Sequence, residues 1–177
     1  LSVARSSSLK VKIAEKVSVL TKKEIQLNSP KNGADLLKLG SGVRVQKSQG
    51  GGGSPVIRGF EANRVLLVVD GIRLNNAIFR SGHLQNAITI DPNYIERVEV
   101  IHGSSSVGYG SDALGGVVHY FTKNPEINSN KKIKNSFSNY FSLANFSNLN
   151  NFSNQYSSKK WGLLTSVTFS NFNDIII

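Results

Sequence analysis

The sequence predicts an α+β domain over residues 1–125, followed by antiparallel β-strands in residues 126–177. In the first part, several short runs of β-branched residues alternate with a few short helical patterns, which is typical of an α+β fold rather than a doubly wound parallel sheet. The second part has a different composition, because residues 124–158 contain 10 Asn and 8 Ser. The segment 123–125, Lys-Asn-Pro, is a turn or linker signal between the two parts.

The elements of the first part can be assigned in order along the chain. Thr21 with Glu24 forms a capping-box pattern, which predicts a helix directly after a short strand at 17–20. A second helix is predicted over 34–39, because Gly40 follows it. Further strands are predicted at 43–46, 55–59, 64–69 (ending in an Asp-Gly turn), 95–101 and 117–121.

The strand patterns also predict which residues of the sheet are buried. Strand 64–69 contains an unbroken apolar run at 65–69, so we expect it to be the central strand. Strand 95–101 alternates strictly, which predicts one buried and one charged face. We expect burial in this one sheet for Val65, Leu67, Val69, Val98, Val100 and Val117.

The second part contains segments of about 10 residues that alternate between apolar and small polar side chains. In 161–173, the residues Leu163, Val167 and Phe169 share one face, and aromatic residues again lie among Asn and Ser in 136–146. This pattern is the weak signature of transmembrane β-strands. An amphipathic hairpin on a soluble sheet would produce the same pattern.

The composition excludes several classes of protein. The chain has 177 residues, a formal net charge of +10, 39% hydrophobic and 18% charged residues, which is too apolar for a disordered tail and too polar for a helical membrane bundle. The longest apolar run, 65–69, is far too short for a transmembrane helix. The absence of Cys excludes disulfides and thiolate zinc sites. The chain begins with Leu and lacks Met, so we expect it to be a piece of a longer protein.

The motifs give no support for catalysis or for a bound cofactor. Gly108-x-Gly110-x-x-Ala113 matches a loose dinucleotide fingerprint, but the strand at 117–121 leaves no room for the required helix. The three His residues are too widely spaced to indicate a metal site. His119, in an apolar strand, is expected to be a hydrogen-bonded packing residue, whereas His83 lies in a polar loop. We therefore expect no enzyme activity and no cofactor.

The basic charge does not indicate nucleic-acid binding. Lys and Arg are scattered along the chain, without a basic helix or an aromatic-interleaved RNA-binding pattern. We therefore expect no nucleic-acid partner, and the charge remains available for anionic surfaces or ligands.

Arg58 is a candidate for a specific charge pair. It follows four glycines, 50–53, on the otherwise apolar strand 55–59. A charge in that position needs a partner, because burying it alone is costly. The candidate partners are Glu96, Glu99 or acids elsewhere in a longer chain, and the alternative is a surface Arg on an edge strand.

Taken in order, these segments resemble the plug domain of TonB-dependent outer-membrane receptors. The resemblance covers about residues 3–125 and rests on the ordered set rather than on any single motif. The segments are 17–25, 35–37, 42–45, Ile57-Arg58-Gly59-Phe60, 64–73, 95–100 and 109–118. Residues 126–177 resemble the first antiparallel strands of the transmembrane β-barrel that follows the plug, truncated here.

The resemblance implies a plug with a small mixed β-sheet and short helices inside a barrel of about 22 strands. It implies energy-coupled import of a scarce nutrient across the Gram-negative outer membrane, with the TonB energy-transducing complex and outer-membrane lipid as partners. It also implies that Arg58 pairs with acids of the barrel wall and forms a plug–barrel lock. The family's second basic position in that lock is occupied here by His102, which would make the lock pH-dependent unless it rests on Arg58 alone.

The segment 75–86 resembles the corresponding segment of haem and haemoglobin receptors. This resemblance implies a ligand-binding set of Arg80, His83, Gln85 and Asn86, with His83 as a possible haem-iron contact. Siderophore and cobalamin receptors share the same scaffold, so an iron-siderophore or another nutrient is an alternative ligand. The alternative to the whole interpretation is a soluble α+β binding or adhesion module without transport activity.

Overall fold

The computed structural model describes residues 16–46, 53–61, 64–74, 85–103, 108–110, 113–127, 130, 132–143 and 146–171. The chain forms two compact units, residues 1–122 and residues 123–177. Each unit is described by itself. In the described part of the chain, no helix combines the length and the apolar character needed to cross a membrane.

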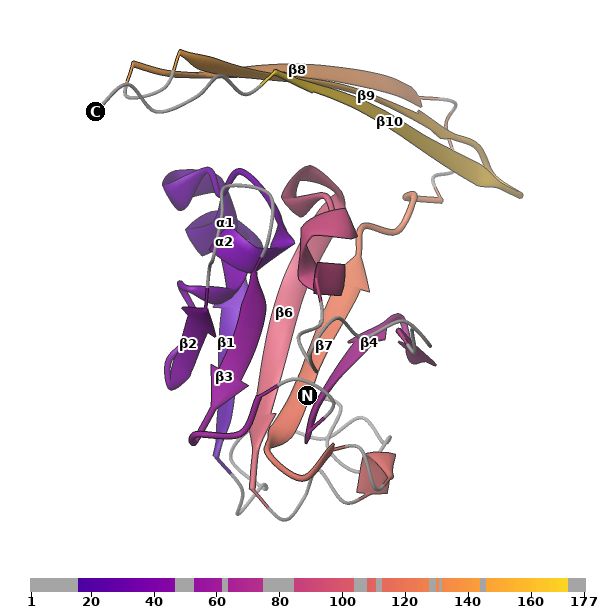
Figure 1. The fold of residues 1–177 in the computed structure, drawn as a ribbon. Coiled ribbons are helices and arrows are strands. Elements are labelled where there is room, and N and C mark those ends of the chain that lie inside the picture. Colours follow the sequence, from indigo (N-terminus) through magenta and orange to yellow (C-terminus); the bar gives the residue numbers. More distant parts are fainter. Residues whose placement is uncertain are drawn as a thin grey trace. The chain divides into compact units, whose positions relative to one another are not determined.

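The first unit is built on a five-stranded mixed sheet (Figure 1). The strand order is β1-β6-β7-β4-β5, in which β4 and β7 are parallel and all other neighbours are antiparallel. The bounds are Val17–Thr21 for β1, Val65–Val69 for β4, Ile72–Arg73 for β5, Ile95–His102 for β6 and Gly116–Thr122 for β7. The prediction that β4 is central was wrong, because β7 pairs with both β6 and β4 and so becomes the middle strand.

Short helices and a two-stranded ribbon complete this unit. The ribbon is formed by β2 (Val43–Gln46) and β3 (Ser54–Ile57). The helices are α1 (Lys22–Asn28), α2 (Gly33–Leu37) and the 3-10 turns η4 (Gln85–Thr89) and η5 (Pro92–Tyr94). The predicted capping box is confirmed, because the Glu24 carboxylate accepts the Thr21 N–H at 2.8 Å and the Thr21 hydroxyl accepts the Glu24 N–H at 3.4 Å. The Thr21 hydroxyl also donates to the Glu24 carboxylate at 2.7 Å, and the two hydrogen bonds from Thr21 to this carboxylate lower the pKa of Glu24.

The sheet is buried on both faces. The larger cluster joins one face to the helices and the ribbon, and includes Leu36, Leu37, Val65, Leu67, Val98, Val100 and Tyr120. The smaller cluster on the opposite face includes Val17, Leu66, Val68, Ile101, Tyr109 and Val117. The predicted burial is therefore confirmed for five of the six residues, with Val117 buried on the opposite face of the same sheet, whereas Val69 is only partly buried.

Strand β6 departs from its predicted alternation at Glu99. The side chain of Glu99 is fully buried, although the pattern predicted a charged, exposed face. Its carboxylate accepts the Arg97 Nε–H at 2.9 Å, and the Arg97 guanidinium lies 3.7 Å from the centre of the Phe121 ring. A buried carboxylate is tolerated here because a charge-assisted hydrogen bond replaces part of its hydration.

The second unit contains a three-stranded antiparallel sheet. Strand β9 (Ser147–Ser157) lies between β8 (Lys132–Ser142) and β10 (Gly162–Asn171). The registers place Ile133, Phe137, Phe152, Leu163, Val167 and Phe169 on one face. The same face also carries Asn at 135, 139, 148, 150, 154 and 171. The opposite face is largely Ser, and there the Asn151 side chain donates to Ser166 and Thr168 at 2.9 and 2.7 Å. The predicted two-faced pattern of 161–173 is therefore confirmed over β10.

Candidate functional site

Arg58 occupies a tight turn directly after β3, not the strand that the sequence predicted. Ile57 and Phe60 exchange backbone hydrogen bonds of 2.9 Å, so Arg58 and Gly59 are the two central residues. Both are left-handed, with φ of 53° and 82°. The turn leaves the Arg58 side chain exposed. Left-handed backbone is uncommon for an Arg, so the turn holds this cation in a position that costs conformational energy.

The Arg58 guanidinium lies against the end of β6. A Cβ atom placed on Gly103 would come within 3.1 Å of the guanidinium Nη1, and Gly103 itself has a φ of 85°. Glycine therefore serves both the local backbone conformation and the close approach of the guanidinium. The sequence suggested Glu96 and Glu99 as acids that could pair with Arg58. In the structure, Glu96 pairs with Lys22 at 3.1 Å and Glu99 pairs with Arg97.

His102 is the other predicted member of this group, and it is buried with only 4% of its surface exposed. Its Nε2 lies 3.3 Å from the Ser18 hydroxyl, which itself donates to the Ser41 carbonyl at 3.1 Å. Burial is the main cause that lowers the pKa of His102, and the positive charges of Lys16 and Arg58 lower it further. The structure thus brings Arg58 and His102 together, with Arg58 as an exposed cation and His102 as a neutral imidazole near neutral pH.

His119 of β7 forms a second polar contact, with the turn that follows β4. Its Nε2 accepts the Gly71 N–H at 3.0 Å, and its ring stacks on Phe121 at a centroid distance of 4.0 Å. The neighbouring Asp70 carboxylate accepts both the N–H and the hydroxyl of Thr122, at 3.0 and 2.6 Å. The expected packing role of His119 is confirmed, since these bonds tie the β4–β5 turn to β7.

The pKa of His119 is also lowered. Burial is the largest cause, opposed by the negative charges of Glu99 and Asp70 and reinforced by Arg97. Its Nδ1 is buried and has no hydrogen-bond partner among the described residues.

Lowered histidine pKa values make the stability of this unit depend on pH. A His in the unfolded chain binds a proton near pH 6.5, whereas His102 and His119 in the folded state resist protonation. The unfolded state therefore binds more protons as pH falls, and stability decreases from about pH 6.5 downward. Urea midpoints measured from about pH 8 to about pH 5 should fall, and they should fall less in a double variant, His102→Gln with His119→Asn. An equally steep fall in that variant would contradict this assignment.

The predicted ligand-binding set cannot be placed as a site. Arg80 and His83 lie outside the described residues. Gln85 and Asn86 begin η4, and only their backbone is described. Among the described residues, no group of three His, Cys, Asp or Glu side chains could hold a metal ion.

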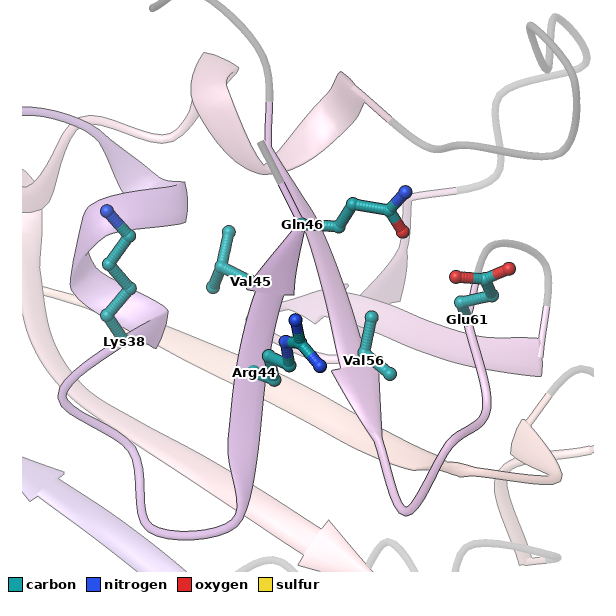
Figure 2. Close-up of a pocket in the computed structure, with 6 residues that line it drawn as sticks. All are labelled: Lys38, Arg44, Val45, Gln46, Val56 and Glu61. Atoms are coloured by element: carbon teal, nitrogen blue, oxygen red, sulfur yellow. The ribbon is translucent and has the colours of Figure 1, made fainter. Parts of the chain in front are cut away.

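A pocket that the sequence did not indicate lies at the β2–β3 ribbon (Figure 2). Its volume is about 500 Å³, and it is lined by Lys38, Arg44, Val45, Gln46, Val56 and Glu61. The alternation of β2 could have placed Arg44 and Gln46 on one side, but no local signal relates them to Lys38 or Glu61. The charged residues of this pocket, Lys38, Arg44 and Glu61, are exposed.

Comparisons with known proteins identify the first unit. The family model described as TonB-dependent Receptor Plug Domain matches residues 10–117, more than half of the chain. The vitamin B12 transporter BtuB of Vibrio vulnificus strain CMCP6 is 42% identical over 111 residues, which cover 62% of this chain and 18% of that protein. The same transporter of Photobacterium profundum is 36% identical over 107 residues, covering 60% and 17%. The chain thus spans about a fifth of the length of these relatives.

Solved structures share the fold. FpvA of Pseudomonas aeruginosa, bound to a heterologous ferric pyoverdine, superposes on this chain with a TM-score of 0.77 at 16% identity. The superposition covers 97% of this chain and 22% of FpvA. The copper transporter OprC gives a TM-score of 0.76 at 22% identity, covering 89% of this chain and 24% of its own. The relatives are transporters and receptors rather than enzymes. The chain therefore belongs to the TonB-dependent receptor plug domain family, whose proteins lie in the outer membrane of Gram-negative bacteria.

Proposed function

We propose that this chain supplies the plug, residues 1–125, and the first barrel strands, residues 126–177, of a receptor that imports a scarce nutrient. The import is energy-coupled through the TonB complex, and the plug closes the barrel lumen and contacts the ligand. The observation that supports this function best is the identity of 42% to a vitamin B12 transporter over the plug. The large apolar side chains of β8–β10 share one face and the opposite face is largely Ser, which agrees with barrel strands between lumen and lipid.

The imported nutrient is proposed to be a large metal-containing compound. The names of the relatives refer to vitamin B12, and those of the fold neighbours to ferric siderophores and copper. Haem remains a candidate because the segment 75–86 contains an imidazole, a common iron ligand, and a guanidinium that matches a carboxylate. In each case Arg80, His83, Gln85 and Asn86 are the proposed contacts.

Uptake by the full-length receptor tests this function. The gene that contains this chain is expressed in a strain without its own receptors, and growth is measured with cobalamin, a ferric siderophore or haem as the limiting nutrient. Growth on one of the three is expected, and it should disappear when TonB is deleted. Growth that persists without TonB would contradict energy coupling. Recovery of the protein only in the soluble fraction would favour the soluble binding module.

If haem is the nutrient, the variant His83→Ala should bind it more weakly and change the Soret band, because an iron ligand is lost. Binding of a ferric siderophore should change little, since the chelator already occupies the iron. Haem binding is measured by absorbance titration of the full-length receptor. An unchanged Soret band in a receptor that binds haem would remove His83 from the proposed site.

Arg58 is proposed to lock the plug to carboxylates of the barrel wall. Removing one partner of a desolvated charge pair typically costs about 2–5 kcal/mol, because the other charge stays unpaired. The variant Arg58→Asn removes the charge while tolerating left-handed backbone, so it should loosen the plug without straining the turn. The ion conductance of full-length Arg58→Asn receptor in planar bilayers should be higher than that of the wild type. The conductance of Arg58→Lys should increase less. Equal conductance of Arg58→Asn and the wild type would contradict the lock.

A further inference from the structure

One end of the β8–β10 sheet combines lysines with an aromatic pair. The turn between β9 and β10 is closed by a hydrogen bond of 2.9 Å from the Ser158 N–H to the Trp161 carbonyl. Lys159 and Lys160 form the tip of this turn, and both are exposed. Lys132, the first residue of β8, lies at the same end, since it pairs with Ser157 of β9.

The aromatic pair lies between this turn and the apolar face of the sheet. The rings of Trp161 and Tyr156 are 4.8 Å apart, centroid to centroid. Tyr156 is directly opposite Ile133 on one side and Leu163 on the other, so it belongs to the apolar face. Trp161 is 55% exposed, although its ring packs on Tyr156. A broad aromatic surface with polar tips thus borders the exposed side chains of Ile133 and Leu163.

The lysines at the tip of the turn are available to an external anion. At this end of the sheet, Lys134 is already paired with Glu126 at 2.6 Å. Among the described residues, neither Lys159 nor Lys160 forms an ion pair. Two adjacent ammonium groups repel each other, and an anion between them relieves that repulsion.

This arrangement matches the chemistry of a membrane interface. Trp and Tyr are favoured at the level of the lipid headgroups, where one part of the ring is apolar and the other is hydrated. Lysine stems extend along apolar surface and carry the ammonium to the phosphates. Each Lys near an anionic membrane surface strengthens binding by about fivefold.

We propose that Lys159, Lys160, Trp161 and Tyr156 form a binding site for the headgroups of anionic phospholipids. The Tyr156–Trp161 pair lies at the edge of the hydrocarbon, and the two ammonium groups contact the phosphates. The site goes beyond the proposed import function, because it requires only that the apolar face of β8–β10 meets lipid and does not depend on the nutrient.

Trp161 is the single tryptophan of the chain, so its fluorescence reports directly on this site. The 177-residue chain is titrated at low salt with vesicles of phosphatidylcholine alone and with vesicles that also contain phosphatidylglycerol. We expect a blue shift of the emission with both, and half-saturation at a lower lipid concentration with phosphatidylglycerol. The double variant Lys159→Gln with Lys160→Gln should lose about tenfold or more of that preference. Lys159→Arg with Lys160→Arg should retain it.

A matched control removes the same charge elsewhere. Lys22→Gln with Lys23→Gln, both in α1, should change the preference by less than about threefold, since neither lysine belongs to the proposed site. Sodium phosphate at matched ionic strength should not shift the emission. The proposal is overturned if the turn variant keeps the full preference, if the α1 variant loses as much, or if free phosphate alone gives the shift. None of these results bears on nutrient uptake, which is measured separately.

Discussion

Replacing Leu67 with Asp is expected to unfold the first unit. Leu67 lies in β4 with 1% of its surface exposed and packs in the larger core cluster against the helices. The substitution removes apolar contacts and buries a carboxylate without a partner, which costs several kcal/mol. Small domains have a total stability of only about 5–15 kcal/mol. Thermal unfolding followed by circular dichroism should show a much lower Tm or no folded baseline.

The matched control for this prediction is Leu27→Asp. Leu27 lies in α1 with 75% of its surface exposed, so the same exchange should change Tm little. An unchanged Tm for Leu67→Asp would mean that β4 does not contribute to the core as described.

Gly33→Ala is expected to destabilise the first unit, although Ala is normally the better helix former by about 1 kcal/mol. Gly33 begins α2, and an added Cβ would lie 2.0 Å from the Ala87 carbonyl oxygen and 2.9 Å from the Ile90 Cβ. The first clash is with backbone, so it can be relieved only by moving α2 away from η4. We expect a loss of about 3 kcal/mol in the free energy of unfolding, measured by urea denaturation.

The control for the glycine variant is Gln26→Ala, an exposed position in α1. That change should leave stability unchanged or slightly higher, because only helix propensity is altered. Stabilisation by Gly33→Ala would show that α2 and η4 are not in close contact.

Local features of this protein were determined by the sequence itself. The Thr21–Glu24 capping box, the Asp70-Gly71 turn and the alternation of β10 were all predicted, and each is observed, with both turn residues left-handed. Their interactions span only a few residues, so the side chains that form them are adjacent in the sequence. The ordered set of motifs likewise indicates the family, because the order and spacing of the segments are properties of the chain alone.

Other features were decided only by tertiary structure. The burial of Glu99 depends on Arg97 and on the packing of the sheet face, and an alternating pattern alone predicts exposure there. The sequence placed Arg58 on a strand, whereas it lies in a turn, and the position of its guanidinium beside Gly103 at the end of β6 is a tertiary contact. The neutral state of His102 likewise follows from burial beside Lys16 and Arg58. Such contacts join residues far apart in the chain, and their energies depend on distances and solvent exclusion that local patterns do not contain.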